Sequence, residues 1–188
     1  MALKQLVLAS QSPRRKQLLE QIGIIPVCAP VNIDESVRDN EEPLDYCLRL
    51  AKEKAQEGWN RSDKLLPTLG SDTIVVLGDV ILGKPKDEKD AYTMLMSLSA
   101  KKHQVITAVA LVDSTKSRVE SSISEVLFDQ LESQEVKEYI ASGEPMDKAG
   151  SYGIQGFAAR WIKYISGSHS GIMGLPLYET SQLLKEFE

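Results

Sequence analysis

The chain has 188 residues, of which 42% are hydrophobic, and its formal net charge at pH 7 is −5. This length and apolar content suit one compact domain or two closely packed lobes with a sizeable core. The acidic balance argues against general nucleic-acid binding, for which a basic face is expected. No apolar run approaches the roughly 18 residues of a membrane span, and the N-terminus lacks a secretory pattern, so we expect no membrane association.

The two cysteines, Cys28 and Cys47, form neither a metal-binding pair nor a disulfide framework. We therefore expect a reducing, cytoplasmic location. The two histidines, His103 and His169, lack the spacing of metal ligands, and His103 at the opening of a strand is typical of a structural role.

The first half of the chain alternates strand and helix patterns. Strands are predicted at 4–9 and 24–29, on either side of a helix at 13–22. A helix at 43–58 carries an apolar face and an opposite face of lysine, glutamate and arginine. Strands at 67–77 and 80–83 flank Gly78-Asp79, a glycine-first hairpin turn.

The second half predicts a helix at 87–99, strands at 103–113 and 118–128 joined by a "DSTKS" turn, a helix at 132–142, a strand at 157–165 and a helix at 176–187. Helices interspersed with hairpins indicate an α/β protein with a mixed sheet rather than a strict alternation. No linker marks a domain boundary, so two lobes, if present, share the sheet.

Two arginines occupy an unfavourable place in "LVLASQSPRRKQLL", residues 6–19. Ser12 is a suitable N-cap and Pro13 a suitable first helical residue, so Arg14 and Arg15 lie at the positive end of the helix dipole. Each mismatch costs about 0.3–1 kcal/mol, which predicts an anionic ligand and no contribution of either arginine to the stability of the empty protein.

Two carboxylates are candidates for metal binding or proton transfer. Asp72 lies inside a strand of largely apolar residues, where aspartate is depleted. It either caps a neighbouring loop or, held at the edge of the sheet, binds a metal or takes a proton from water. Glu35, in the polar "NIDESV" loop, is by itself typical of a solvated loop acid.

Basic residues are a further set of candidates. Lys52 and Lys54 lie on a charged helix face that is typical of solvated side chains. Lys84, in "GKP", has its ammonium group oriented by its loop, because Gly83 permits close backbone approach and Pro85 restricts the backbone that follows. No Walker loop, dinucleotide fingerprint or nucleophile elbow is present.

A glycine-dense segment runs from 149 to 177. It forms either tight turns between short strands or a surface on which backbone N–H groups approach an anion. Within it, the Gln155 amide offers one donor and one acceptor side, which suits the edge of a nucleobase.

Five ordered motifs resemble the Maf family: S-x-S-P-R-R, G-S-D-T, G-K-P, "YGIQG" and "GS…GLPL". Members are nucleoside triphosphate pyrophosphatases, historically described as septum-formation inhibitors. The resemblance implies one Maf-like domain over 1–188 with an inosine-triphosphatase-like α/β fold: an elongated mixed sheet and two lobes around a central cleft. It also implies a divalent cation, Mg²⁺ or Mn²⁺, and suggests a homodimer.

The resemblance assigns roles residue by residue. It makes Asp72, Glu35, Lys54 and Lys84 catalytic, with Asp72 as the base and Asp72 and Glu35 as metal ligands. It makes Ser10, Arg14, Arg15, Thr73 and Gln155 substrate-binding. The selective positions Arg14, Thr73 and Gln155 are similar to those of the branch acting on dTTP and UTP. His169 and the "SGIMG" stretch depart from the family pattern.

The implied reaction is attack of water on the α-phosphorus of a nucleoside triphosphate, which yields a monophosphate and pyrophosphate. Two alternatives remain at this stage. One is a pyrophosphatase of 7-methyl-GTP or another modified nucleotide, and the other is a non-catalytic nucleotide-binding regulator of cell division.

Overall fold

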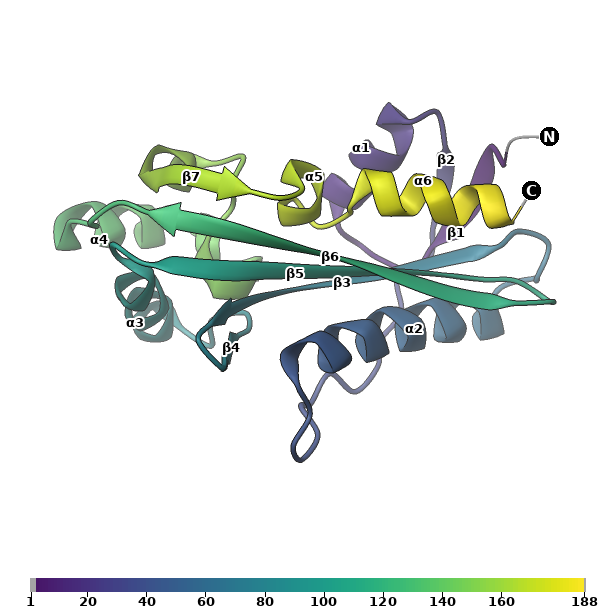
Figure 1. Ribbon diagram of the computed structural model, residues 1–188, viewed down its shortest axis with the longest axis horizontal. Coiled ribbons are helices and arrows are strands. Elements are labelled where there is room, and N and C mark those ends of the chain that lie inside the picture. The colour runs from purple at the N-terminus through teal and green to yellow at the C-terminus, as the bar shows by residue number, and fades with distance from the viewer. Residues whose placement is uncertain (1–2, 188) are drawn as a thin grey trace. The chain divides into compact units, whose positions relative to one another are not determined.

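The structure is a computed structural model, and it describes residues 3–187. Its strands and α-helices are labelled in Figure 1. In chain order they are β1 (Gln5–Leu8), α1 (Pro13–Gln21), β2 (Ile25–Cys28), α2 (Pro43–Arg61), β3 (Thr68–Leu77), β4 (Val80–Leu82), α3 (Glu88–Leu98), β5 (Lys102–Val112), β6 (Ser117–Phe128), α4 (Ser133–Ala141), β7 (Ile162–Ser166), α5 (His169–Ile172) and α6 (Leu177–Glu186). Three 3₁₀ helices, η1 (Glu144–Asp147), η2 (Ala149–Ser151) and η3 (Phe157–Trp161), lie between α4 and β7.

The described strands form one seven-stranded sheet in the order β2-β1-β3-β5-β6-β7, with β4 paired to β3. Strand β1 pairs parallel with β2 and with β3, whereas β3–β4 and β6–β7 are antiparallel. The sheet is therefore mixed, as the interspersed helices and hairpins predict. Leu77 pairs with Val80, so the two residues Gly78 and Asp79 form the hairpin turn, and Gly78 takes a positive φ of 60°.

The chain divides into two compact units, and β3, β5 and β6 contribute residues to both. The first unit comprises the described residues up to Asp72, Thr107–Ser122 and the described residues from Gly174 onward. The second comprises Thr73–Ile106 and Ile123–Met173.

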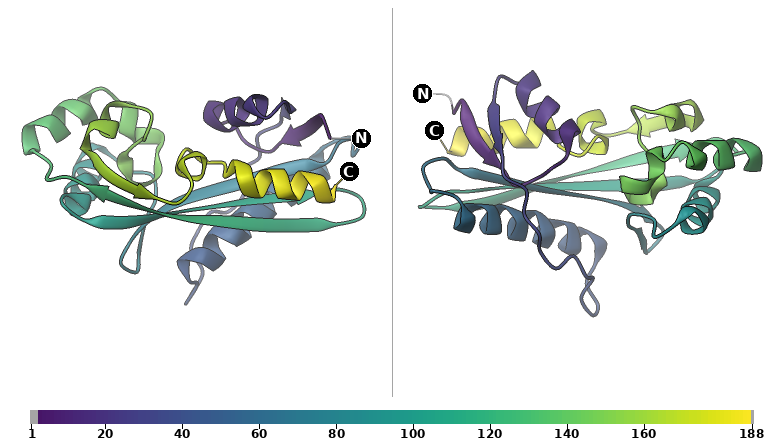
Figure 2. Two further views of the ribbon diagram at one scale, coloured as in Figure 1. Left: turned by 45° about the horizontal axis from the view of Figure 1, so that its top comes forward. Right: turned by 180° about the vertical axis from the view of Figure 1, so that it is seen from behind.

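Within the first unit, α2 covers one face of the strands and α6 the opposite face, as both views of Figure 2 show. Its core consists of aliphatic side chains from the strands and helices, among them Leu6, Leu8, Leu19, Leu50, Leu69, Leu111 and Leu183. Burial of this apolar surface is what holds the helices against the strands.

The second unit has its own core, which is built around aromatic rings. Phe128, Tyr139, Tyr152 and Trp161 meet largely edge to face, with His103 among them. His103 is buried, and its Nε2 lies 2.8 Å from the Tyr152 hydroxyl. The structural role expected of this histidine is thus confirmed.

The expected strand at 157–165 is wrong in its first half. Phe157–Trp161 forms η3, and β7 begins only at Ile162. Ala158 and Trp161 are both buried, and residues three apart share one face of a 3₁₀ turn, whereas a strand would place them on opposite faces. Helix α2 also runs to Arg61, three residues beyond its predicted end.

Candidate active site

Asp72 lies on β3, and a glycine two residues earlier determines what it faces. A Cβ added at Gly70 would overlap the backbone of Ala51 and Ala55 on α2. The strand and the helix therefore approach as closely as their backbones allow. Residues i and i+2 of a strand share a face, so Asp72 is turned toward the same helix as Gly70.

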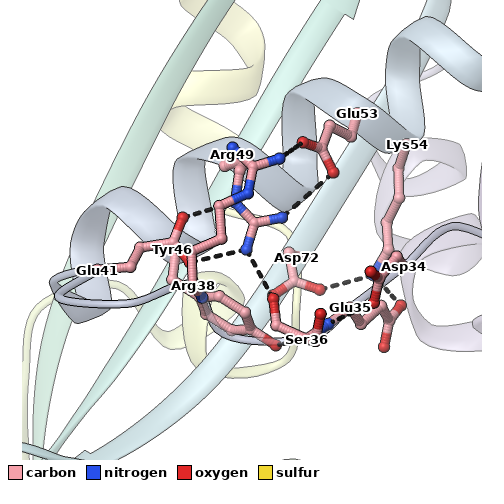
Figure 3. A network of polar contacts seen from close by, with 10 residues as sticks. All are labelled: Asp34, Glu35, Ser36, Arg38, Glu41, Tyr46, Arg49, Glu53, Lys54 and Asp72. Carbon is pink, nitrogen blue, oxygen red and sulfur yellow. Dashed lines mark hydrogen bonds and ion pairs between the residues drawn. The ribbon is translucent and has the colours of Figure 1, made fainter.

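Lys54 of α2 joins Asp72 to Glu35. Its Nζ lies 2.7 Å from Asp72 Oδ1 and 2.7 Å from Glu35 Oε1. Figure 3 shows these side chains converging from β3, α2 and the loop that precedes α2. Two carboxylates, 37 residues apart in the sequence, thus become neighbours through one ammonium group.

The expectation of a solvated Lys54 is wrong. Its side chain is only 12% exposed, while Lys52 on the same helix is exposed. Glu35 is exposed, as expected of a solvated loop acid, since its side chain is 49% exposed, but it is also paired with Lys54. An ammonium group this far removed from water needs a partner of opposite charge, and the cluster supplies two.

The backbone around Glu35 contacts α2 through residues that the sequence did not single out. The Tyr46 hydroxyl donates to the Glu35 carbonyl over 2.7 Å, and Arg49 Nη2 donates to the Ser36 carbonyl over 3.0 Å. Arg49 also binds Glu41 through two nitrogens (Figure 3). The available signal was an arginine between Leu48 and Leu50, close to the apolar face of the helix.

Arg15 and Arg14 have different surroundings. Arg15 donates from Nε to the Gly174 carbonyl and from Nη1 to Ser10 Oγ, over 2.8 and 3.1 Å. Burial lowers the pKa of Arg15, and the charges of Asp72 and Glu35 oppose that shift. The Arg14 side chain, in contrast, has no hydrogen bond or ion pair with another residue of the described chain.

Helix α1 begins at Pro13 and has no acidic residue in its first turn, as predicted. Ser12 is the N-cap residue, as predicted, but its hydroxyl makes no capping hydrogen bond. Instead Ser10 Oγ accepts from the Ser12 N–H over 3.2 Å. Ser10 is buried and is thus engaged by both the helix start and Arg15.

The remaining predicted residues, Thr73, Lys84 and Gln155, belong to the second unit. Lys84 is exposed after β4, and the Gly83 carbonyl accepts from the Gly150 N–H over 3.0 Å. A Cβ at Gly83 would meet no atom within 4 Å, so close backbone approach is not the reason for this glycine.

Gln155 is exposed on a turn closed by the Gly156 N–H and the Gly153 carbonyl, 3.2 Å apart. Glu144 packs against this turn: its Oε2 accepts from the Phe157 N–H, and a Cβ at Gly156 would overlap its carboxylate. The glycine-dense segment is therefore turn and 3₁₀ structure as far as Trp161, and in this part Gly156 makes room for a neighbouring carboxylate.

Neither histidines nor cysteines form a metal centre in the described chain. No group of three or more His, Cys, Asp and Glu side chains within residues 3–187 is arranged to hold an ion. Burial raises the pKa of the Cys47 thiol, whose Sγ contacts the Asp72 carbonyl at 3.5 Å. From residue 3 to residue 187, no helix combines the length and the apolar character needed to cross a membrane.

The chain is similar to known proteins over almost its whole length. The family model described as Maf-like protein matches residues 5–187. A dTTP/UTP pyrophosphatase of Aliivibrio fischeri is 50% identical over 187 residues, which are 97% of this chain and 98% of the relative. A dTTP/UTP pyrophosphatase of Chromobacterium violaceum is 48% identical over 184 residues, 96% of this chain and 93% of the relative.

Likeness to solved structures is weaker. A nucleoside-triphosphatase / dITP/XTP pyrophosphatase from Mycobacterium abscessus superposes with a TM-score of 0.45 at 16% identity, covering 66% of this chain and 74% of the other. Likeness at this level supports no conclusion about substrate or mechanism.

Proposed function

Because the chain belongs to the Maf family, we propose that it is a pyrophosphatase that hydrolyses dTTP and UTP to the nucleoside monophosphate and pyrophosphate. The observation that carries this proposal is the cluster of Glu35, Lys54 and Asp72, in which one nearly buried ammonium group holds two carboxylates. A cluster of this kind has the groups needed to bind a cation and to accept a proton.

The two carboxylates fit a hard divalent cation such as Mg²⁺ or Mn²⁺. Mg²⁺ favours sites with one or two carboxylates, substrate phosphate oxygens and retained water, and it does not require a cage of three protein ligands. Asp72 and Glu35 would hold the ion. When bound, it would neutralise negative charge on the triphosphate oxygens.

In the proposed reaction Asp72 orients the attacking water and accepts its proton. The water oxygen bonds to the α-phosphorus while the bond from that phosphorus to the bridging oxygen breaks. Pyrophosphate leaves with the bridging oxygen. Lys54 orients both carboxylates through its two 2.7 Å contacts, so the base is in place before substrate arrives.

Positively charged side chains bind the phosphate groups of the triphosphate. We assign Arg14 to direct phosphate binding, because it lies in the first turn of α1, its side chain has no hydrogen-bond or ion-pair partner in the described chain, and a planar guanidinium suits phosphate oxygens. Ser10 and Arg15 shape this corner, and Lys84 supplies further charge for the leaving pyrophosphate. The N-terminal N–H groups of α1 favour an anion at the same end.

Base selection is assigned to Arg14, Thr73 and Gln155. A uracil or thymine edge presents a ring N–H beside a carbonyl, and the Gln155 amide complements both groups. Guanine presents two adjacent donors, which suit a carboxylate better. This chemistry favours the pyrimidine triphosphates named for the relatives.

The deciding experiment is a substrate panel with Mg²⁺ or Mn²⁺: dTTP, UTP, CTP, GTP and 7-methyl-GTP, with products identified as monophosphate and pyrophosphate. We expect the highest kcat/KM for dTTP and UTP. A preference for 7-methyl-GTP would contradict the substrate assignment. Nucleotide binding without turnover of any triphosphate would instead identify a non-catalytic regulator.

The Asp72→Asn variant tests the catalytic assignment within the same panel. It removes the proton acceptor while keeping the shape, so we expect turnover to fall roughly 10²–10⁴-fold. Asp79→Asn, on the exposed turn after the same strand, is the matched control and should keep wild-type turnover. Near wild-type turnover of Asp72→Asn would contradict the role of this carboxylate.

A further inference from the structure

Glu35 lies on a segment that has no helix or strand to hold it. Residues 29–42, here called the Glu35 loop, connect β2 to α2 and contain only one turn, at 39–40. The Glu35 side chain is 49% exposed, and an ion pair with this much water contact contributes little by itself. The contact with Lys54 orients the carboxylate but does not hold the loop backbone that carries it.

Two side chains of α2 hold the backbone on which Glu35 is carried. Tyr46 Oη donates to the carbonyl of Glu35 itself, over 2.7 Å. Arg49 Nη2 donates to the carbonyl of the next residue, Ser36, over 3.0 Å. Consecutive carbonyls are thus fixed from one helix, which leaves the Glu35 side chain little freedom other than its own rotamers.

Arg49 also closes the far end of the loop. Its Nε and Nη2 lie 2.5 and 2.7 Å from the two carboxylate oxygens of Glu41, in a paired arrangement that lysine cannot reproduce. The two side chains are 12% and 9% exposed. The hydrogen bond from Arg49 lowers the pKa of Glu41 to about 2, so this carboxylate stays charged across the physiological range.

Tyr46, Arg49 and Lys54 reach the loop from one helix, with Arg49 three residues and Lys54 eight residues after Tyr46. At 3.6 residues per turn, Arg49 and Lys54 lie about 60° and about 80° to opposite sides of Tyr46, so the three side chains share one broad face of the helix. Figure 3 shows this face turned toward the Glu35 loop, with Lys54 directed at Glu35 and Asp72.

We propose that Tyr46 and Arg49 are positioning residues that hold the Glu35 carboxylate beside Lys54 and Asp72 in the catalytic arrangement. This inference rests on the proposed function, because it gives Glu35 a part in turnover. In this role the two residues act through Glu35 and not through contact with substrate. A residue that merely cross-links the loop for stability would have the same contacts, so the test must separate the two roles.

Tyr46→Phe is the main variant, because it removes one hydroxyl and keeps the ring. We expect kcat/KM for UTP to fall by about tenfold, the scale of one hydrogen bond left unmade, with the reduction in kcat rather than in KM. Arg49→Lys keeps the charge but loses the paired contact, and should reduce kcat further. The matched controls are Tyr178→Phe, on an exposed tyrosine, and Arg61→Lys, in an exposed pair with Glu57. Both should keep wild-type kcat.

A double-mutant cycle with Glu35→Gln provides the readout that a structural role would not change. If Tyr46 acts through the Glu35 carboxylate, Tyr46→Phe has no further effect on kcat/KM in the Glu35→Gln background. If Tyr46 only stabilises the fold, Tyr46→Phe reduces kcat/KM by the same factor in both backgrounds. Where the double variant turns over too slowly to measure, the test is the rate of amide hydrogen exchange in the peptide spanning residues 31–42. It should be faster in Tyr46→Phe than in wild type, with the exchange of β3 unchanged.

The outcomes are separable. Wild-type protein that hydrolyses no triphosphate contradicts the proposed function. Wild-type protein that hydrolyses UTP, together with Tyr46→Phe and Arg49→Lys variants at wild-type kcat, overturns the positioning role alone. Equal losses in both backgrounds, or unchanged exchange of the loop, overturn it as well.

Discussion

Arg15 donates from Nε to the backbone carbonyl of Gly174 over 2.8 Å, and so joins the first helix to a residue 159 positions later in the chain. The same carbonyl accepts from Ser71 Oγ over 3.1 Å. Ser71 immediately precedes Asp72 in β3. One carbonyl thus connects the start of α1 to the strand that carries the proposed base.

This relationship separates the two arginines in their effect on stability. Arg15→Met should lower the free energy of unfolding of the nucleotide-free protein by about 1–3 kcal/mol, because a charge-assisted hydrogen bond is lost. Arg14→Met is the matched control and should be neutral, or stabilising by about 0.3–1 kcal/mol at low salt, because a charge opposing the helix dipole is removed. Chemical unfolding without nucleotide measures both. Equal effects of the two variants would contradict the distinction.

Gly70 should tolerate no side chain. Gly70→Ala places a Cβ where the backbone of Ala51 and Ala55 already lies, so α2 must move away from β3. We expect a loss of about 3 kcal/mol or more in the free energy of unfolding, since backbone atoms cannot rotate aside. Gly83→Ala is the control, because its Cβ would enter open space at an ordinary φ. A Gly70→Ala protein as stable as Gly83→Ala would contradict the close approach.

His103 makes stability depend on pH. Burial lowers its pKa from 6.5 to about 4, so the folded protein keeps this ring neutral while the unfolded chain takes up a proton below pH 6.5. Stability is therefore complete above pH 6.5 and falls as the pH drops toward 4, by on the order of 3 kcal/mol.

The variants for this prediction are His103→Gln and Tyr152→Phe. His103→Gln removes the titrating group, so the difference in unfolding free energy between wild type and this variant should shrink as the pH falls from 6.5 to 4. Tyr152→Phe removes the hydroxyl 2.8 Å from Nε2 but leaves the ring buried, and should retain the wild-type slope. A difference between wild type and His103→Gln that is constant over this range would show that His103 does not titrate there.

Gln155→Glu should change base selection. A carboxylate facing a uracil carbonyl is repelled, so kcat/KM for UTP and dTTP should fall strongly. The loss corresponds to at most several kcal/mol of transition-state binding free energy. Any gain with GTP should be partial, because Arg14 and Thr73 are unchanged. The measured quantity is the UTP to GTP ratio of kcat/KM. Gln130→Glu adds the same charge on an exposed loop and should leave that ratio unchanged, while an unchanged ratio in Gln155→Glu would mean that Gln155 does not read the base.

The sequence by itself determined the order and type of most elements, and it singled out the candidate site residues. Periodicity sufficed for β3 and α2 because their apolar residues recur at the spacing of a strand or a helix. It failed at 157–161, where "FAARW" has β-favouring residues at both ends but buries Ala158 and Trp161 on one face of a 3₁₀ turn. Local propensity does not predict the 3₁₀ turn, because its contacts come from α4. The Tyr139 ring stacks on Phe157, and the Glu135 carboxylate accepts from Trp161 Nε1.

Only the tertiary structure decided which charges meet. Lysine, arginine and glutamate on α2 form a pattern typical of a solvated helix face, and Lys52 follows it. Lys54 and Arg49 do not, because the Glu35 loop and Asp72 lie against that face and remove water from it. The energy of an ion pair depends on its distance and on the water around it, and both are set by the packing of segments far apart in the chain. The sequence contains the charged residues, but the fold determines which of them act together.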